Sequence, residues 1–234
     1  GWRFMAADDV PRQHDNVLVE SMVREALIRL NPEIRQQPER AGEVLYSLQA
    51  LLFSVQGEGL VRTNELFAAW LRGEKSMPFG ENGEHTPVRL LDFDNLANNE
   101  YVITSQWVYP VREGGRRFDI VLLINGIPLV IGEAKSPVRP AVSWLDGASD
   151  IHNGYEQSVP QMFVPNVFSF ATEGKCYRYG SVRMPVGMWG PWHEGDDRSE
   201  GSLAHVQRAV RAMLRPRVIL DILQNFTLFA TDKK

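Results

Sequence analysis

The chain has 234 residues, of which 44% are hydrophobic and 23% are charged. This composition is typical of a folded globular protein and excludes a largely disordered or low-complexity chain. The 25 basic and 29 acidic residues give a formal net charge of −4. A general nucleic-acid-binding protein is usually strongly basic, so any contact with DNA would need a local basic patch or a partner.

The single cysteine, Cys176, excludes a disulfide framework and a cysteine-based zinc site. We expect it to be a buried, inert thiol, because it lies in a strand pattern with no obvious base nearby. No apolar run is long enough to span a membrane, and the first residues contain no secretory leader. These features favour a cytoplasmic protein with no membrane partner, and Gly1 reads as a start inside a longer chain.

The first third of the chain has the periodicity of amphipathic helices. Apolar side chains recur at three- and four-residue spacing, with Asp15 as the expected N-cap and Pro32 as the stop of the first helix. Pro38 suits the first turn of the second helix, and Gly73 suits the end of the third. The three predicted helices cover residues 16–30, 38–55 and 63–72, and the polar residues 73–85 form a loop.

The pattern then changes to strands. Two near-continuous apolar runs are joined by Asn125 and Gly126, a dipeptide typical of a tight β-hairpin. Runs this apolar indicate strands covered on both faces. The predicted strands are residues 88–93, 101–109, 118–124 and 127–135.

The last third alternates between the two patterns. Residues 144–157 are expected to be partly helical, 167–172 and 176–181 to form a second hairpin, and 187–201 to form a loop. Helices follow over residues 202–214 and after Pro216. The fold class is therefore α/β or α+β, with a central mixed β-sheet flanked by helices. We expect one domain over residues 1–234: a helical part (1–73), a β-rich core (86–181) and C-terminal helices (202–230).

Three ionisable residues stand in or beside the first apolar hairpin. Asp119 lies near the start of one strand, and Glu133 and Lys135 lie two residues apart at the end of the other, so these two share a face. Charges at the ends of buried strands are costly unless they are paired or bind a metal ion. Two carboxylates and the backbone carbonyl of Ala134 suit a hard divalent cation such as Mg²⁺. With Lys135 beside them, they could hydrolyse a phosphodiester.

The register of this hairpin tests the interpretation. With a two-residue turn and regular pairing, Asp119 would lie opposite Gly132, and the two carboxylates would point to opposite faces. We therefore predict either a three-residue turn or a β-bulge that brings Asp119 opposite Glu133. The alternative is structural, since a Glu-x-Lys pair at a strand end is often a solvated edge pair.

Several segments together resemble a known family. They are Leu18-Val19-Glu20, Leu91-Asp92-Phe93-Asp94-Asn95, Asn125-Gly126-x-Pro128, Glu133-x-Lys135-Ser136-Pro137 and Thr172-Glu173-Gly174. This set resembles the N-terminal nuclease region of the restriction (R) subunit of type I restriction enzymes, within the PD-(D/E)XK nuclease superfamily. The resemblance extends over nearly the whole chain.

The resemblance implies a function and its residues. It assigns Asp119 and Glu133 as metal ligands and Lys135 as the cation on the phosphate side, and it adds Glu20 as a further acid near the site. A surface glutamate is the alternative for Glu20. The family's helix after the motif often has a Gln four residues before a Tyr; here Tyr155 matches, but the Gln position holds Ile151.

The resemblance also implies a cofactor and partners. It indicates an Mg²⁺-dependent endonuclease domain acting on double-stranded DNA beside specificity and modification subunits. ATP would be used only by motor domains, which this chain lacks, because it contains no phosphate-binding Gly-x-x-x-x-Gly-Lys-Ser/Thr loop. Another repair or recombination nuclease of the superfamily, and an inactive nuclease fold that only binds DNA or docks, remain alternatives.

The remaining expectations concern DNA contacts, histidines and tryptophans. Candidate DNA contacts are Arg116, Arg117, Tyr155, Lys175 and Arg178, with solvated strand ends as the alternative for the basic residues. The five histidines show no metal-ligand spacing and are expected to be structural or on the surface: His14, His85, His152, His193 and His205. Trp189 and Trp192 are expected to pack on the sheet rather than to dock another domain.

Overall fold

The computed structural model describes residues 1–111, 114–139, 141–193, 195 and 198–229. A six-stranded mixed sheet forms its centre, in the order β1-β4-β5-β6-β7-β8. The β1–β4 and β6–β7 pairs are parallel and the other pairs are antiparallel. The strands are β1 (Arg3–Phe4), β4 (Tyr101–Pro110), β5 (Gly115–Ile124), β6 (Ile127–Ala134), β7 (Phe168–Thr172) and β8 (Tyr177–Gly180). This arrangement confirms the predicted mixed sheet flanked by helices.

The α-helices are α1 (Glu20–Leu30), α2 (Pro32–Gln36), α3 (Arg40–Glu58), α4 (Leu60–Leu71), α5 (Trp144–Ser149), α6 (Glu156–Ser158), α7 (Leu203–Met213) and α8 (Pro216–Asp221). Wider π-helical turns cover Asp150–Tyr155 and Ile222–Phe226. Short 3₁₀ turns cover Ala7–Asp9, Glu81–Gly83, Leu96–Asn98, Pro160–Phe163 and Val186–Met188. A small separate sheet pairs β2 (Ser76–Met77) with β3 (Thr86–Pro87).

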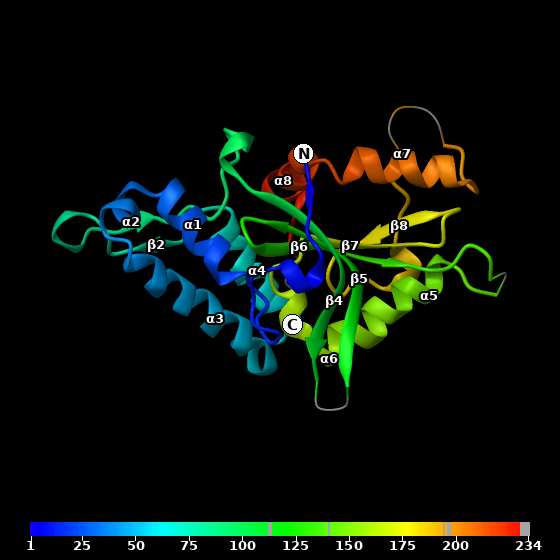
Figure 1. Cartoon of the computed structure of the whole chain (residues 1–234), viewed down its shortest axis with the longest axis horizontal. Helices are drawn as coiled ribbons and strands as arrows, with labels where there is room; N and C mark the ends of the chain where they lie inside the picture. The colour runs from blue at the N-terminus through cyan, green and yellow to red at the C-terminus, as the bar shows by residue number, and fades with distance from the viewer. Residues whose placement is uncertain (112–113, 140, 194, 196–197, 230–234) are drawn as a thin grey trace.

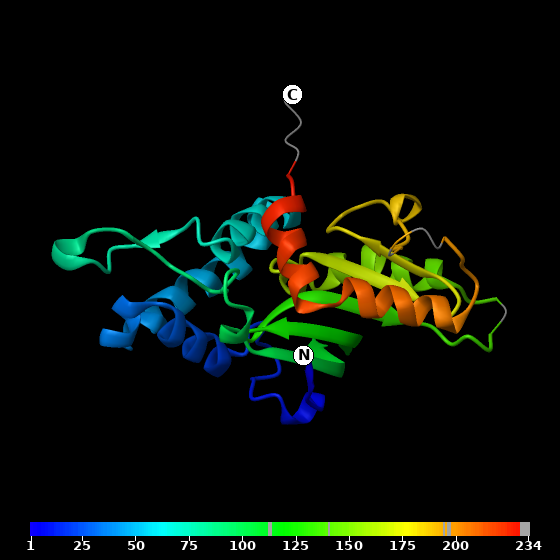
Figure 2. The same ribbon diagram turned by 90° about the horizontal axis from the view of Figure 1, so that it is seen from above.

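Helices α5 and α7 cover opposite faces of the sheet (Figures 1 and 2). On one face, α5 packs at Gly147 against Ala171 of β7 and Glu133 of β6. On the other face, Tyr177 of β8 donates a hydrogen bond to the sulfur of Met213 in α7 at 3.3 Å. Helices α1 to α4 form a separate group at one end of the sheet (Figure 1).

The hairpin of β5 and β6 is the most buried part of the sheet. Residues 121–124 and 127–131 are buried on both faces, as their continuous apolar sequence predicts. The turn has positive φ at both central residues, 52° at Asn125 and 79° at Gly126, which is the backbone that an Asn-Gly hairpin turn requires. Val19 at the start of α1 donates its backbone N–H to the Gly126 carbonyl at 2.9 Å, so the turn also anchors the helical group.

The predicted strand over residues 88–93 is wrong. The segment is largely buried, but asparagine side chains take the place of a neighbouring strand. Asn31 accepts from the backbone N–H of Arg89 and donates to its carbonyl, and Asn125 donates to the carbonyl of Leu90. Backbone groups satisfied in this way do not need a sheet, and the periodicity of apolar residues cannot reveal such partners.

The helix boundaries also differ from prediction. Helix α1 begins at Glu20 rather than residue 16, and Asp15 is not its N-cap. Pro32 begins the short helix α2 instead of only ending α1, because proline is well suited to a first helical position. The second predicted helix, 38–55, is α3 and begins at Arg40, and the third, 63–72, is α4 and begins at Leu60. The predicted loop 73–85 contains the short strand β2.

The C-terminal half follows the prediction more closely. The partly helical segment is confirmed as α5, the π-helical turn and α6, and the second hairpin is confirmed as β7 and β8. Ser202 caps α7 by accepting from the backbone N–H of His205, as predicted. The predicted loop 187–201 includes residues 194, 196 and 197, which lie outside the described residues, and the predicted C-terminal helices include residue 230, which also lies outside them.

Two side-chain expectations have clear outcomes. Trp189 is buried and Trp192 packs edge-on against Tyr179, with 5.9 Å between ring centroids, so both pack on the sheet as predicted. Cys176 is only half-buried rather than buried, but desolvation raises the pKa of its thiol, which fits an unreactive group. No helix in the described part of the chain is long and apolar enough to cross a membrane.

Candidate active site at the β5–β6 hairpin

A β-bulge in β6 brings the two carboxylates to the same position of the ladder. Ile124 pairs with Ile127 across a two-residue turn, but the register shifts between Leu122 and Leu123, so that Leu122 pairs with Val130 and Ile120 with Gly132. The shifted register places Asp119 opposite Glu133 instead of Gly132, on one face of the sheet. The predicted bulge is therefore confirmed.

Short contacts join the three predicted residues. One carboxylate oxygen of Asp119, Oδ2, accepts the backbone N–H of Ala134 at 3.0 Å. The Lys135 ammonium donates to Glu133 Oε1 at 2.8 Å. The backbone N–H of Lys135 donates to the Thr172 carbonyl of β7 at 2.8 Å, which fixes the residue just beyond the end of β6. The hairpin thus gathers two acids and one base near the C-terminal end of β6, a central strand of the sheet.

Burial gives Glu133 unusual acid–base behaviour. The residue is only 4% exposed, and desolvation raises the pKa of its carboxyl to about 7. Asp119 and Asp150 raise this pKa further by charge repulsion, whereas Lys135 lowers it. Glu133 Oε2 is buried and has no hydrogen-bond partner among the described residues. A buried oxygen left in this state is a strong candidate for binding a cation.

A fourth charged residue, Asp150, joins the site. It lies at the start of the π-helical turn after α5, and its carboxylate accepts a second hydrogen bond from the Lys135 ammonium. These two ion pairs keep the pKa of the Lys135 ammonium above its ordinary value, so the lysine stays charged. Sequence analysis missed Asp150, because nothing in the local pattern predicts a π-helical turn, although such turns are frequent at functional sites.

Gln106 of β4 also contacts the site and was missed. Its side-chain amide donates to Asp119 Oδ1 at 3.2 Å from the neighbouring strand. Its backbone has φ of 59°, a left-handed conformation that is uncommon for a residue other than glycine. Both oxygens of Asp119 are therefore oriented by hydrogen bonds, one from β4 and one from β6.

Tyr155 lies within electrostatic reach of this cluster. Its ring packs edge-on against Phe118, with 5.1 Å between centroids. Desolvation and the nearby Glu133 and Asp150 raise the pKa of its phenol to about 12, so it remains a neutral hydrogen-bond donor. Ile151, at the position where the family often has Gln, is fully buried in the core and contributes no polar group.

Glu20 makes its hydrogen bonds away from this cluster. Its carboxylate accepts from Asn16 at 2.8 Å and from Gln49 at 2.6 Å, beside a pocket that Tyr109 also lines. These contacts explain its position by local structure, and no described contact joins it to Asp119 or Glu133.

The candidate DNA contacts are dispersed. Arg116 donates to Ser158 at 3.0 Å, and Arg178 forms an ion pair with Glu200 at 2.8 Å while lying over the ring of Trp144. Arg117 is exposed on β5, and Lys175 lies in the turn between β7 and β8. Among these candidates, Tyr155 has a phenol whose pKa is raised by the nearby Glu133 and Asp150.

Within the described residues, no group of three or more His, Cys, Asp or Glu side chains has the arrangement of a complete metal site. Mg²⁺ is usually held by one or two carboxylates, and water and substrate phosphate fill its remaining positions. Asp119 and Glu133, with its unpartnered Oε2, are the candidate pair.

The fold, a six-stranded mixed sheet flanked by helices, is consistent with a nuclease-like α/β core. Residues 1–185 match the family model described as Type I restriction enzyme R protein N terminus, and the chain belongs to this family. It is 28% identical to the Type I restriction enzyme HindI endonuclease subunit of Haemophilus influenzae over 99% of this chain and 23% of that protein. It is also 32% identical to the Putative type I restriction enzyme MjaIXP endonuclease subunit of Methanocaldococcus jannaschii, over 58% of this chain and 14% of that protein. The chain therefore spans less than a quarter of the length of these relatives.

Proposed function

We propose that this chain is the nuclease part of a type I restriction R protein and hydrolyses phosphodiester bonds of double-stranded DNA with a bound divalent cation. The observation that carries this proposal is the bulge in the β5–β6 hairpin. In the shifted register Asp119 lies opposite Glu133, and the Lys135 ammonium donates a hydrogen bond to the Glu133 carboxylate. Membership of the R-protein family supports it independently.

Each residue has a separate role. Asp119 and Glu133 hold the cation, and the carbonyl of Ala134 is available as a further oxygen ligand. A lysine ammonium has three donors, and Glu133 and Asp150 use two of them. The third donor can bind a non-bridging oxygen of the scissile phosphate and stabilise the negative charge that develops there. The neutral phenol of Tyr155 can donate a further hydrogen bond to the DNA backbone.

The metal ion that best fits is Mg²⁺, because the donors are hard carboxylate oxygens and no thiol or imidazole is among them. When bound, it would lower the pKa of a water ligand and polarise the phosphodiester. Among the described side chains, Gln106 keeps Asp119 oriented, and Asp150 keeps the lysine ammonium at the site.

The alternatives receive less support. Another repair or recombination nuclease is disfavoured by the match of residues 1–185 to the R-protein family. An inactive fold would have no need to keep two carboxylates and a lysine together around a buried, unpartnered oxygen. We propose that residues 1–234 form one nuclease domain and that Glu20 is a structural glutamate, with no role as a metal ligand.

The remaining parts of the activity belong to the whole R protein. Its motor domains would use ATP to move DNA toward this nuclease, and specificity and modification subunits would choose the DNA site. We place this assembly in the cytoplasm, where double-stranded DNA and these subunits meet.

The test uses the full R protein assembled with its partner subunits. We expect Asp119→Ala and Lys135→Ala each to lower the rate of plasmid DNA cleavage by at least about 1000-fold, because each removes a group needed in the transition state. DNA binding and ATP hydrolysis should remain near the wild-type level. Lys75→Ala, which removes a lysine on the distant 73–87 segment, is the matched control and should cleave normally.

Cleavage that survives both substitutions would refute the assignment of the site. DNA binding with no metal-dependent cleavage by the wild-type assembly would instead support the inactive, DNA-binding alternative.

A further inference from the structure

A π-helical turn carries two of the residues that lie near the carboxylate cluster. The turn covers Asp150–Tyr155, between α5 and α6. In an α-helix residues three or four apart share a face, whereas the i→i+5 hydrogen bonds of a π-helix bring residues five apart onto one face. Asp150 and Tyr155 are five residues apart. The wider turn therefore lets Asp150 reach the Lys135 ammonium while Tyr155 lies within electrostatic reach of Glu133.

The end of this turn is tied to the segment that follows β8. Glu156 comes directly after the turn, and its two carboxylate oxygens accept the backbone N–H of Arg183 at 3.1 and 3.2 Å. The Arg183 guanidinium lies 3.6 Å from the same carboxylate. It also donates to the backbone carbonyl of His152, inside the turn, at 3.4 Å. Arg183 thus contacts the turn at its middle and just beyond its end.

The Glu156 carboxylate is buried at this contact. Besides Arg183, His152 Nδ1 lies 3.5 Å from one of its oxygens. Burying a carboxylate is costly even when it is hydrogen-bonded, and desolvation raises the pKa of this carboxyl to about 7. A buried polar contact specifies one arrangement of its partners more strictly than apolar packing does. The contact is therefore suited to fixing the position of the π-helical turn.

The backbone of Arg183 is adapted to the same contact. The Met184 N–H donates to the Ser181 carbonyl at 3.0 Å and closes a four-residue turn. Arg183 is the third residue of that turn and has φ of 59°, a left-handed conformation that is uncommon outside glycine. Strained backbone of this kind persists only where surrounding contacts hold it. The two hydrogen bonds from its N–H to Glu156 are such contacts.

We propose that Glu156 and Arg183 position the π-helical turn for the nuclease reaction, so that Asp150 and Tyr155 stay beside Lys135 and Glu133. This inference rests on the proposed function. Glu156 acts through Asp150, which holds the lysine ammonium at the site. Without the contact the turn is free to relax to an α-helix, in which residues five apart no longer share a face.

Two variants of similar size separate the contact from the burial. Glu156→Gln and Glu156→Met both remove the charge, but only glutamine keeps a strong acceptor for the Arg183 N–H. Each is made in the full R protein assembled with its partner subunits, and the assays run below its measured Tm. We expect Glu156→Met to lower the single-turnover cleavage rate by about tenfold with little change in apparent KM, and Glu156→Gln to recover most of the rate. Glu58→Ala, at an exposed glutamate of α3, is the control and should cleave like wild type.

Labelling of Lys135 with an amine-reactive acyl reagent gives a readout that does not depend on cleavage. Asp150 holds one of the lysine's hydrogen bonds, so Lys135 should be labelled at least about threefold faster in Glu156→Met than in wild type. Mass spectrometry measures the labelling, with Lys75 on the distant 73–87 segment as the internal reference. A purely structural role for Glu156 would lower the Tm without changing this labelling.

The outcomes separate this inference from the proposed function. A folded Glu156→Met variant that cleaves DNA and labels Lys135 like wild type overturns the positioning role. If the wild-type assembly does not cleave DNA with Mg²⁺, the proposed function fails, and faster labelling of Lys135 still supports the positioning role. In an Asp150→Asn background, Glu156→Met should cost much less than it does alone, and an equal cost would overturn the route through Asp150. Glu156→Asp, which draws the carboxylate back by one methylene, gives the same test if Glu156→Met does not fold.

Discussion

Glu133 is the residue on which the chemistry depends most closely. Its carboxyl is buried against α5, where Gly147 leaves room for it, and its two oxygens have different surroundings. One accepts from Lys135, and the other is buried without a partner among the described residues. Burial raises the pKa of this carboxyl to about 7. The same burial destabilises the ionised carboxylate, so a bound cation that compensates its charge stabilises it.

The pKa of Glu133 predicts a pH dependence for metal binding. Below about pH 7 the carboxyl is mostly protonated, and a metal ligand must be deprotonated, so the proton competes with the metal. We expect the affinity for Ca²⁺, which can be titrated without cleavage, to fall by about tenfold for each pH unit below 7 and to level off above it. Isothermal titration between pH 5.5 and 8.5 measures this. An affinity that is constant over this range would contradict a role for Glu133 as ligand.

Asp150 predicts an effect through Lys135. When Glu133 binds a metal, Asp150 remains as the acidic partner that holds the lysine ammonium at the site. We expect Asp150→Asn to lower the single-turnover cleavage rate by about tenfold, the usual scale for groups that orient a reacting side chain, with little change in apparent KM for DNA.

Asp150→Glu is the matched variant, because it keeps the charge, and it should recover part of the rate. A normal rate for Asp150→Asn would show that the ion pair does not position Lys135.

At the scale of elements, the site depends on how β6 packs between its neighbours. Gly132 precedes Glu133, and a Cβ placed on it would lie 2.2 Å from the ring of Phe170 on β7. Because Gly132 has no side chain, the ring of Phe170 can pack directly against the backbone of β6. On the opposite face, the missing side chain of Gly147 in α5 leaves room for the side chain of Glu133.

This packing predicts that Gly132→Ala destabilises the protein. Phe170 is buried, so its ring cannot move away freely, and we expect a loss of about 1–3 kcal/mol from overpacking. For a chain of this size that corresponds to a Tm lower by roughly 2–10 °C in a thermal unfolding experiment. Gly187→Ala is the control, because nothing lies within 4 Å of a Cβ there, and its Tm should be unchanged. Equal Tm values for the two variants would contradict this description of the packing.

At the scale of the whole molecule, buried acids link stability to pH. Glu156 is 4% exposed, and desolvation raises the pKa of its carboxyl to about 7, although its oxygens accept the backbone N–H of Arg183. A raised pKa in the folded state means that the folded protein holds this proton more tightly than the unfolded chain. The stabilisation is fully present below the ordinary pKa of 4.5 and is lost as the pH rises through about 7.

We therefore expect Glu156→Gln to stabilise the protein more at pH 8 than at pH 5. The amide keeps an oxygen that can accept from Arg183 and never becomes charged. The change in Tm relative to wild type should be about 2–6 °C more favourable at pH 8, as measured by thermal unfolding at both pH values. A change in Tm that is the same at both pH values would contradict a raised pKa for Glu156.

The parts of this molecule that follow local rules could be predicted from the sequence. Asn125 and Gly126 indicated the turn, and the apolar runs around them indicated a hairpin buried on both faces. Counting residues around that turn required a bulge if Asp119 and Glu133 were to meet, and the bulge is present. The strand pattern of residues 88–93 misled because its hydrogen bonds go to the side chains of Asn31 and Asn125 from distant segments.

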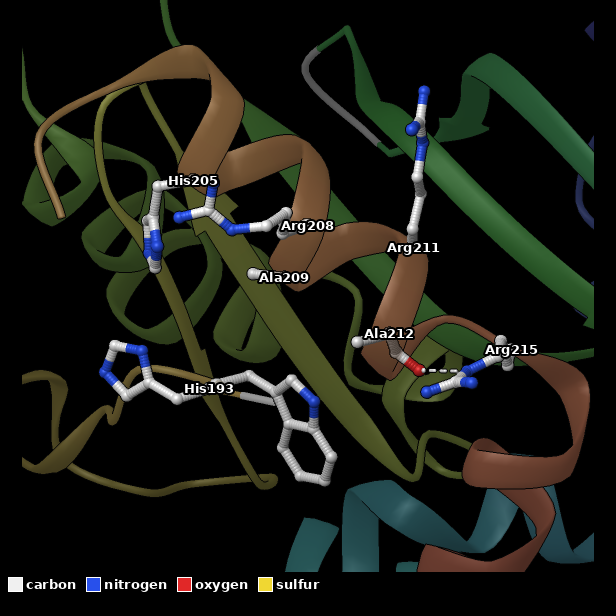
Figure 3. Close-up of a pocket in the computed structure, with 8 residues that line it drawn as sticks. His193, His205, Arg208, Ala209, Arg211, Ala212 and Arg215 are labelled. Atoms are coloured by element: carbon white, nitrogen blue, oxygen red, sulfur yellow. Dashed lines mark hydrogen bonds between the residues drawn. The ribbon is translucent and has the colours of Figure 1, made fainter. Parts of the chain in front are cut away.

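The remaining features depend on contacts between distant segments. Asp150, in the π-helical turn, accepts a hydrogen bond from Lys135 beyond the end of β6, and Gln106 of β4 donates one to Asp119 of the neighbouring strand β5. The hollow between α7 and the segment of Trp192 and His193 also joins distant parts of the chain, so no single stretch of sequence contains it (Figure 3). Such features appear only when the chain has been folded in three dimensions.

The central claim is that one divalent cation is held jointly by Asp119 and Glu133. Crystals of the chain soaked with Mn²⁺, which substitutes for Mg²⁺ and scatters anomalously, measure this directly. We predict one anomalous peak within about 2.0–2.6 Å of an oxygen of each carboxylate. A peak bound elsewhere, or no peak at a saturating Mn²⁺ concentration above pH 7.5, would contradict the account.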